Sequence, residues 1–294
     1  KDAKAVENGY EAVVDIPFEN AEFKPATEIL IDFVAVNGSN KVVFNDYTYS
    51  QDEKSEYYAK AVLKPYAFIP KGTVTVDGVR DDAWKDAANI PLLINLGSKV
   101  SANASLLWDE EYLYAYVNVT DSVLNSDSAN AHEKDSFELF IDENNNKTNS
   151  YEDDDKQYRI NYLNEHSFNG KKCLEENITS FANVTDNGYE IELAIKWTDI
   201  TPEVGNNIGL ELQINDADAT GSRIGTLSWY DVSGQGWSKP GVFGTVTLAD
   251  KAGEAPVPEE SEVDPSDIPE DGVIPEGLWI AKVKDATYTS KAVE

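Results

Sequence analysis

Short stretches of alternating polar and apolar residues dominate the sequence between about residues 66 and 249. Clear examples are SFELFID at 136–142, QYRINYL at 157–163 and IGLELQIND at 208–216. Because successive side chains of a strand point to opposite faces, each stretch can bury one face and leave the other polar. Many short strands between turns, with little helical periodicity, predict an all-β fold: an antiparallel, two-sheet β-sandwich of jelly-roll-like form.

Other stretches extend this pattern. ASLLWDEEYLYAYVNVTD predicts a hairpin with its turn at residues 109–111, and GTVTVDG at 72–78 predicts a further strand that ends at a turn. DDAWKDA at 81–87 predicts a single helical turn. We therefore expect one complete sandwich module over residues 66–249.

The segment before this module repeats part of it. NGYEAVVDIPFENAEFKPATEILIDFVAVN parallels NGYEIELAIKWTDITPEVGNNIGLELQIND, so that Tyr10 aligns with Tyr189 and Phe18 with Trp197. Residues 1–65 are therefore interpreted as the C-terminal half of a preceding β-sandwich module. Two unrelated amphipathic segments are the alternative.

The composition changes after the module. Residues 250–276 are rich in proline and acidic residues and nearly free of large apolar ones, which predicts an extended acidic linker. Residues 277–294 regain strand character and are interpreted as the start of a truncated further module. We expect the chain to be a piece of a longer protein.

The charge of the chain limits its partners. Its 54 acidic and 24 basic residues give a formal net charge of −30, which disfavours nucleic acid and supplies many oxygen ligands for a hard cation such as calcium. Its single cysteine, Cys173, excludes an internal disulfide, and its two histidines, His132 and His166, are not at a zinc spacing. No run is long and apolar enough to predict membrane insertion.

Two acidic loops are candidates for calcium. The loop TDSVLNSDSANAHEKD carries oxygen ligands at short spacings, at Asp121, Asn125, Asp127 and Asn130. The run ENNNKTNSYEDDD at 143–155 predicts a solvated hairpin loop that could also hold calcium, although it lacks the glycine and terminal glutamate of an EF-hand loop. The same stretch could instead supply two catalytic carboxylates, as glycoside hydrolysis requires, but nothing in it singles out a pair.

The tryptophans differ in their surroundings. Trp84, Trp108 and Trp197 stand within apolar patterns and are expected in the core, whereas Trp229 at a strand end could be buried or exposed. Trp237 lies in SGQGWSKPG, a loop without a strand pattern. An exposed indole there predicts a binding role, because aromatic faces stack on sugar rings.

Three polar residues occupy separate predicted strands: Glu138, Arg159 and Gln213. Polar side chains within strands need partners. They could form an ion pair on a solvated sheet face or line a binding site, and the pattern leaves both open.

Several of these motifs together resemble the family 9 carbohydrate-binding modules of bacterial xylanases. The resemblance rests on TVTVDGVRDDAW, DSFELFIDENNNKTNSYEDDDKQYRINY, YEIELAIKW, LQINDA and the spaced SW, W and FG, and it covers residues 68–248. It implies a two-sheet antiparallel sandwich with structural calcium and no catalysis. It also implies binding to the chain ends of a plant cell-wall polysaccharide, xylan or cellulose.

The resemblance also implies roles for particular residues. Trp237 matches the second of two tryptophans that clamp a sugar, and Glu138, Arg159 and Gln213 fall on positions that bond sugar hydroxyls. The first clamp tryptophan falls on His132, which is a departure from the pattern.

Three functions are therefore carried forward. The first is a non-catalytic polysaccharide-binding module of a secreted, extracellular xylanase-type enzyme. The second is a glycoside hydrolase domain that uses paired carboxylates. The third is a structural or adhesive spacer of a cell-surface protein with a vestigial sugar site.

Overall fold

The computed structural model of the chain describes residues 2–6, 9–13, 28–37, 40–46, 48–50, 53–62 and 64–251. The chain divides into two compact units, and the larger one spans Pro65–Pro256. No helix in the described ranges is long and apolar enough to span a membrane.

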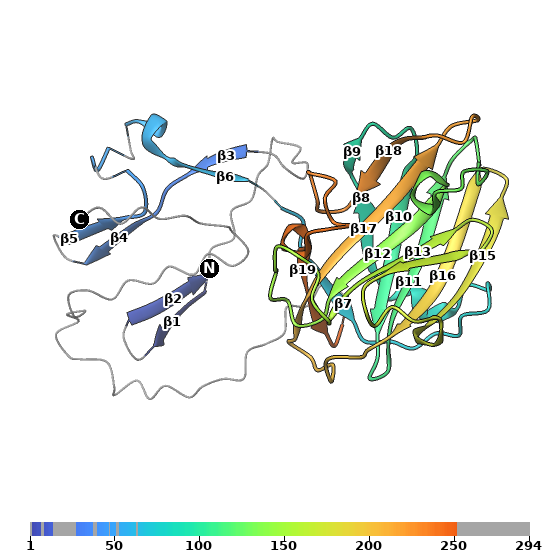
Figure 1. Cartoon of the computed structure of the whole chain (residues 1–294). Helices are drawn as coiled ribbons and strands as arrows, with labels where there is room; N and C mark the ends of the chain where they lie inside the picture. The colour runs from blue at the N-terminus through green and yellow to red at the C-terminus, as the bar shows by residue number, and fades with distance from the viewer. Residues whose placement is uncertain are drawn as a thin grey trace. The chain divides into compact units, whose positions relative to one another are not determined.

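The smaller unit contains short antiparallel strand pairs in its described residues (Figure 1). The pairs are β1 (Asp2–Val6) with β2 (Gly9–Val13), β3 (Glu28–Ile31) with β6 (Ala59–Val62), and β4 (Val34–Asn37) with β5 (Asn40–Val43), and a 3-10 turn, η1, spans Ser55–Tyr57. The interpretation of residues 1–65 as half a sandwich module stays a prediction, because the segment 14–27, with Phe18, lies outside the described residues. The expected linker at 250–276, beyond residue 251, and the expected further module at 277–294 also lie outside them.

The first sheet of the larger unit has five antiparallel strands in the order β15-β16-β11-β10-β8. They are β8 (Ala88–Leu92), β10 (Ser101–Trp108), β11 (Tyr112–Thr120), β15 (Ile178–Thr185) and β16 (Gly188–Lys196). The predicted hairpin is confirmed, since Trp108 on β10 pairs with Leu113 on β11.

The second sheet has eight strands, in the order β14-β13-β12-β17-β18-β9, with β19 pairing with both β17 and β7. They are β7 (Ala67–Pro70), β9 (Ile94–Leu96), β12 (Ser136–Asp142), β13 (Asp155–Asn161), β14 (His166–Asn169), β17 (Asn207–Ala217), β18 (Arg223–Ser228) and β19 (Gly244–Ala249). Short 3-10 turns complete the unit: η2 (Asp82–Lys85), η3 (Ala131–Glu133), η4 (Glu175–Asn177) and η5 (Pro240–Val242). The β7–β19 pair is parallel, which departs from the fully antiparallel expectation.

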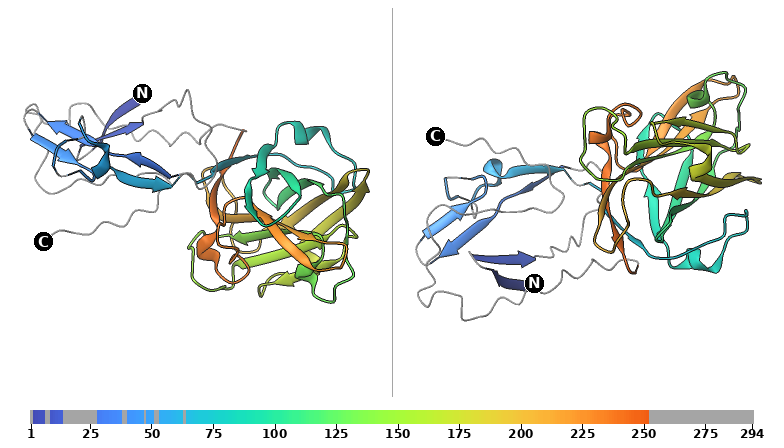
Figure 2. Two further views of the ribbon diagram at one scale, coloured as in Figure 1. Left: turned by 90° about the horizontal axis from the view of Figure 1, so that it is seen from above. Right: turned by 60° about the horizontal axis from the view of Figure 1, so that its bottom comes forward.

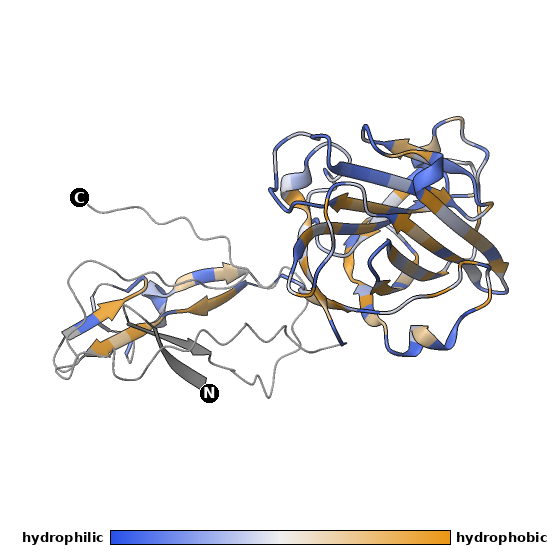
Figure 3. Cartoon of the chain, turned by 90° about the horizontal axis from the view of Figure 1, so that it is seen from below, coloured by the Kyte–Doolittle hydropathy of each residue, from blue (hydrophilic) through white to orange (hydrophobic). Residues whose placement is uncertain are grey.

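The two sheets form two layers that enclose one apolar core (Figure 1 and Figure 2). Leu106 and Trp108 of β10 and Phe137 and Leu139 of β12 belong to this core and are at most 1% exposed. The hydrophobic residues gather on the strands and the loops are largely hydrophilic (Figure 3). The all-β sandwich expected from the alternating stretches is therefore confirmed.

The segment GTVTVDG at 72–78 is not a strand, which corrects the sequence-based expectation. Gly72 N–H still donates to the Trp108 carbonyl oxygen of β10 (2.9 Å), but carboxylates bind later backbone donors: Thr75 N–H donates to Asp81 (2.7 Å), and Gly78 N–H donates to Glu192 (3.1 Å). Val74 is nevertheless buried, in a small cluster with Trp84 on the outer side of the five-stranded sheet. The alternation of residues 72–78 therefore predicted the burial of Val74 correctly, but it wrongly predicted a paired strand.

Candidate functional site

A polar row crosses the outer face of the eight-stranded sheet. Glu138 on β12 stands directly opposite Arg159 on β13 and Gln213 on β17. The neighbours Phe137 and Leu139 point into the core, so alternation places Glu138 on the opposite face. The three residues that the sequence scattered over three strands are therefore side by side.

Glu138 is the centre of this row. Its Oε1 accepts hydrogen bonds from Arg159 Nε and Asn215 Nδ2, both at 2.5 Å, and its Oε2 accepts one from Gln157 Nε2 at 2.6 Å. The Glu–Arg ion pair considered from the sequence therefore exists, but Glu138 is only 1% exposed, so the sheet face here is not simply solvated. A buried carboxylate held by three donors is fixed in position.

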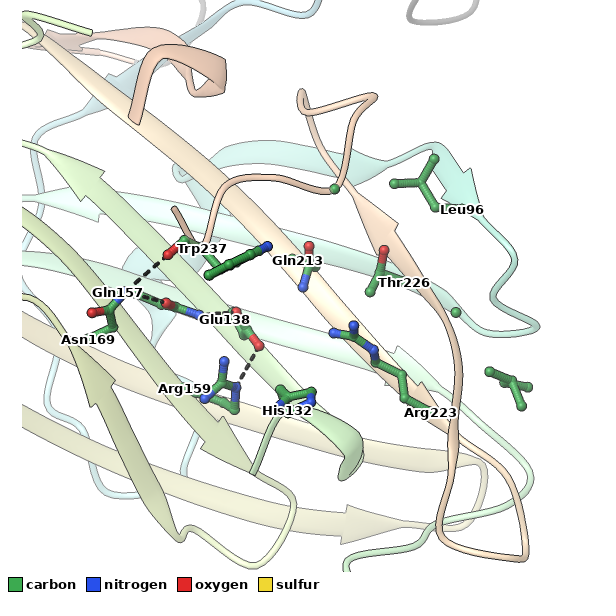
Figure 4. A pocket seen from close by; sticks show the side chains of 13 residues that line it. Leu96, His132, Glu138, Gln157, Arg159, Asn169, Gln213, Arg223, Thr226 and Trp237 are labelled. Atoms are coloured by element: carbon green, nitrogen blue, oxygen red, sulfur yellow. Dashed lines mark hydrogen bonds and ion pairs between the residues drawn. The ribbon is translucent and has the colours of Figure 1, made fainter. Parts of the chain in front are cut away.

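The row lines a pocket of about 810 Å³ (Figure 4). The lining residues are Leu96, His132, Glu138, Gln157, Arg159, Asn169, Gln213, Arg223, Ile224, Gly225, Thr226, Gly234 and Trp237. The pocket therefore brings together all five residues to which the resemblance assigned sugar contacts.

Trp237 is the exposed aromatic residue of this pocket. Its side chain is 63% exposed, whereas Trp84, Trp108, Trp197 and Trp229 are each at most 7% exposed. The burial expected for the first three is thus confirmed, and Trp229 joins the core.

Hydrogen bonds hold the backbone around Trp237. Asn169 Nδ2 donates to the Trp237 carbonyl oxygen (3.0 Å), and the Tyr151 hydroxyl donates to the Gly236 carbonyl oxygen (2.9 Å). The indole of Trp237 is therefore exposed to solvent, while hydrogen bonds fix the backbone that carries it.

Two buried carboxylates shape the loop that carries Trp237. Glu211 on β17 is 1% exposed and accepts hydrogen bonds from the backbone N–H groups of Trp229 (2.9 Å) and Asp231 (2.7 Å). Asp231, 3% exposed, in turn accepts bonds from the N–H groups of Gln235 (2.7 Å) and Gly236 (3.0 Å). The loop conformation is therefore set by side chains that do not touch the pocket.

His132 lines the pocket from η3, in the loop between β11 and β12. Its side chain is exposed. In Figure 4 it lies on the side of Glu138 away from Trp237. His132 and Trp237 therefore line the pocket on opposite sides of Glu138. The resemblance implied a tryptophan at the position of His132.

The sequence reasoning missed several pocket residues. Gln157 could have been found, because it lies two residues before Arg159 on the same strand and so shares its face. Asn169, on the next strand β14, pairs with Gln157 of β13. Arg223, Thr226 and Leu96 carried no such signal, since their place beside the row depends on the order of the strands in the sheet.

The first carboxylate cluster lies where β11 ends, β12 begins and β17 ends. Oxygen atoms of Asp121, Asp135 and Asp216 lie within 4.8 Å of one another. Asp121 Oδ2 is buried without a hydrogen-bond partner in the described structure. The pKa of Asp135 is raised to about 7, mainly by burial; the nearby carboxylates of Asp121 and Asp216 contribute to the rise, and the backbone N–H donors of Ala217 and Asn125 oppose it. Such a set of buried oxygens suits a hard cation.

Of the two aspartates expected as calcium ligands in the loop 120–135, Asp121 belongs to this cluster and Asp127 does not. Asn125 Oδ1 accepts a hydrogen bond from Asp127 N (2.8 Å), and Asn130 Nδ2 donates to Glu133 (3.3 Å). Asp127 and Asn130 are exposed. Asp135 ends the same loop and was overlooked among its other oxygen ligands, whereas Asp216 comes from a distant part of the sequence, which no local spacing reveals.

A second cluster closes the hairpin loop between β12 and β13. Oxygen atoms of Asp142, Asp154 and Asp155 lie within 4.8 Å of one another. Asp154 Oδ2 and Asp155 Oδ1 are buried without a hydrogen-bond partner in the described structure. Burial, with the Asp142 and Asp154 carboxylates adding to it, raises the pKa of Asp155 to about 6. This loop is the ENNNKTNSYEDDD stretch for which the sequence left calcium open.

Comparison with known proteins agrees with this fold and pocket. Residues 76–251 match the family model described as "Carbohydrate family 9 binding domain-like". The chain is 41% identical over 259 residues to endo-1,4-beta-xylanase A of Thermoanaerobacterium saccharolyticum, which covers 83% of this chain and 22% of that protein. It is 40% identical over 256 residues to exoglucanase XynX of Acetivibrio thermocellus, covering 83% and 23%. The chain thus spans less than a quarter of the length of these relatives.

Solved structures are similar as well. A family 9 carbohydrate-binding module of Caldicellulosiruptor kristjanssonii in complex with cellotriose superposes with a TM-score of 0.61 at 30% identity, over 66% of this chain and 98% of that one. The same module in complex with glucose gives a TM-score of 0.60 at 29% identity, over 65% and 98%.

Proposed function

The chain belongs to carbohydrate-binding family 9, and on that premise we propose that its larger unit binds the chain ends of xylan or cellulose without catalysis. The observation that carries the proposal is the pocket in which Trp237, 63% exposed, stands beside the buried row around Glu138.

The pocket offers what a sugar ring needs. An indole face covers the apolar face of a pyranose ring, and planar amide and guanidinium groups form directed hydrogen bonds to its hydroxyls. Gln213 is 7% exposed and Arg159 is held by Glu138 and Ser167, so these groups are oriented before the ligand arrives. Little conformational freedom is lost on binding.

The alternative of a glycoside hydrolase finds no support in this pocket. Hydrolysis of a glycosidic bond uses two carboxyl groups on either side of the bond, one of them protonated. Among the pocket-lining residues Glu138 is the only carboxylate, and its oxygens are occupied by Arg159, Asn215 and Gln157. We therefore assign binding, and no chemistry, to this site.

The role of the whole protein follows from its relatives. Xylanases and an exoglucanase match this chain over less than a quarter of their own length, which leaves ample room for a separate catalytic domain. We propose that the full-length protein is an extracellular, xylan-degrading hydrolase and that this module holds it on plant cell wall. Attachment raises the effective concentration of substrate at the catalytic domain.

Calcium is proposed as a structural ion. Each carboxylate cluster has three aspartates whose oxygens converge within 4.8 Å, and each has a buried oxygen without a hydrogen bond in the described structure. A bare cluster of this kind is destabilised by charge repulsion, whereas a bound calcium would supply the missing partner. The residues present therefore fit the ion, and it would stabilise loops on both sides of the pocket.

Calorimetric titration tests the proposed function. The chain is titrated with cellobiose and xylobiose and with the alditols obtained by reducing them. Binding of the disaccharides with loss of affinity for the alditols is expected for a site that takes a cyclic reducing end. Release of reducing sugar from xylan by the purified chain, or equal affinity for the alditols, would contradict the proposal.

A further inference from the structure

One cation of the pocket has no direct ion pair within residues 64–251. Arg223, at the start of β18, lines the pocket, and its Nη1 donates a hydrogen bond to the neutral Oδ1 of Asn215 (2.9 Å). Within residues 64–251, no carboxylate lies at ion-pair distance from its guanidinium, whereas Arg159 is paired with Glu138. The two pocket arginines are therefore in different electrostatic situations.

The rest of the pocket does not neutralise Arg223. Glu138 carries the only negative charge among the lining residues, and Arg159 already compensates it at 2.5 Å. Glu133, next to His132 on η3, attracts Arg223 electrostatically, but it forms no ion pair with it and does not line the pocket. The Glu133 carboxylate accepts hydrogen bonds from Ser128 (2.5 Å) and Asn130 (3.3 Å) instead. The lining residues thus carry a net positive charge in a chain whose formal net charge is −30.

His132 adds a second donor on the same side. No hydrogen bond joins its ring to any other residue of the described larger unit, and the ring lines the pocket. Figure 4 shows His132 and Arg223 on the side of the polar row away from Trp237. A ligand that rests on the indole would therefore present its far edge to a guanidinium and an imidazole.

We infer that the pocket takes a sugar that carries a carboxylate, with the carboxylate paired to Arg223. This inference rests on the proposed function, since the same pocket and Trp237 hold the ring. A guanidinium presents parallel N–H donors that match the two oxygens of a carboxylate, and Arg223 has donors beyond the Nη1 bonded to Asn215. A hexuronate unit combines this carboxylate with the pyranose ring that the proposed function requires.

The test compares a carboxylate with its neutral isostere. At fixed ionic strength, the full chain is titrated calorimetrically with glucose, glucuronate, the methyl ester of glucuronate, and gluconate. We expect glucuronate to bind about tenfold more tightly than its methyl ester, the effect of one charge-assisted hydrogen-bonded pair. Gluconate carries a carboxylate on an open chain, so it should bind more weakly than glucuronate at a site that takes a cyclic sugar. Equal or tighter binding of gluconate would overturn the inference.

Two variants complete the test. Arg223→Gln removes the charge and keeps hydrogen bonding, and it should reduce the preference for glucuronate over the ester to about one. Lys196→Gln removes an exposed charge from β16 of the other sheet and should leave the preference unchanged. Equal affinities for glucuronate and its ester in the unmodified chain, or a preference that survives Arg223→Gln, would overturn the inference alone. Failure of glucose, cellobiose and all four probes to bind would overturn the proposed function with it.

Discussion

Trp237 and His132 line the same pocket but offer a sugar ring very different surfaces. The indole of Trp237 is large, apolar and 63% exposed, whereas the imidazole of His132 is a small polar ring. Stacking energy grows with the apolar area removed from water, so most of it must come from Trp237. A one-sided clamp of this kind binds neutral sugars weakly.

His132→Trp should therefore strengthen binding of cellobiose. Covering several tens of Å² more apolar surface, at roughly 25 cal/mol per Å², contributes about 1–2 kcal/mol, or about tenfold in affinity. Calorimetry measures the change, with Val184→Trp on β15 of the other sheet as the matched control. An affinity that stays the same in His132→Trp would show that His132 does not form the second wall.

The sequence allowed part of this site to be predicted, for a physical reason. Glu138, Arg159 and Gln213 each take the polar position between two apolar residues of an alternating stretch, and a polar residue within a strand needs a partner. Arg223 could not be found this way, because only the pairing of β18 with β17 brings it next to the row. Asp216 was hidden for the same reason, since it meets Asp121 only in the folded sheet.

At the scale of elements, the loop between β18 and β19 determines where Trp237 stands. Asp231 organises it by accepting bonds from the N–H and hydroxyl of Ser233 and from the N–H groups of Gln235 and Gly236. A carboxylate can accept all four bonds at once because both of its oxygens are acceptors. An amide in its place has one acceptor oxygen and one donor nitrogen.

Asp231→Asn should therefore loosen the loop and weaken sugar binding about tenfold, the effect of losing roughly one buried hydrogen bond to a charged group. Asp109→Asn is the matched control, because Asp109 accepts backbone bonds from Glu111 and Tyr112 in the β10–β11 turn of the other sheet. It should lower the melting temperature without changing affinity. Equal sugar affinities for Asp231→Asn and the unmodified chain would rule out a positioning role for this loop carboxylate.

The strands themselves were predictable where alternation and pairing coincide, as in β10, β11, β12 and β17. Alternation wrongly predicted a strand at residues 72–78, where the carboxylates of Asp81 and Glu192 accept hydrogen bonds from the backbone N–H groups of Thr75 and Gly78. It also gave no sign of the parallel pair β7–β19, in which Ile69 stands opposite Leu248. Alternation reports which face is buried and says nothing about which strand lies alongside.

At the scale of the whole molecule, we expect the two aspartate clusters to make stability depend on pH and on calcium. Burial raises the pKa of Asp135 to about 7 and that of Asp155 to about 6, above the value of about 3.9 for an unfolded aspartate. A carboxyl group whose pKa is raised by folding stabilises the fold at pH values below the unfolded pKa, and this stabilisation is lost as the pH rises through the folded pKa.

With chelator present, the melting temperature should therefore fall between pH 5 and pH 8. Calcium binds the ionised carboxylates, so it should raise the melting temperature most at pH 8 and remove much of this trend. Asp135→Asn should reduce both effects, and magnesium is the control ion, since it keeps its bound water more firmly. Identical melting curves in calcium and in chelator at pH 8 would refute structural calcium.

The central claim is that the chain binds polysaccharide ends through Trp237, and one measurement tests it most directly. The full chain and Trp237→Ala are titrated calorimetrically with cellobiose and xylobiose in the presence of calcium. Because the side chain is 63% exposed, its removal should leave the melting temperature nearly unchanged. The account predicts binding by the unmodified chain and loss of measurable binding in the variant. Equal affinity in both proteins would contradict it.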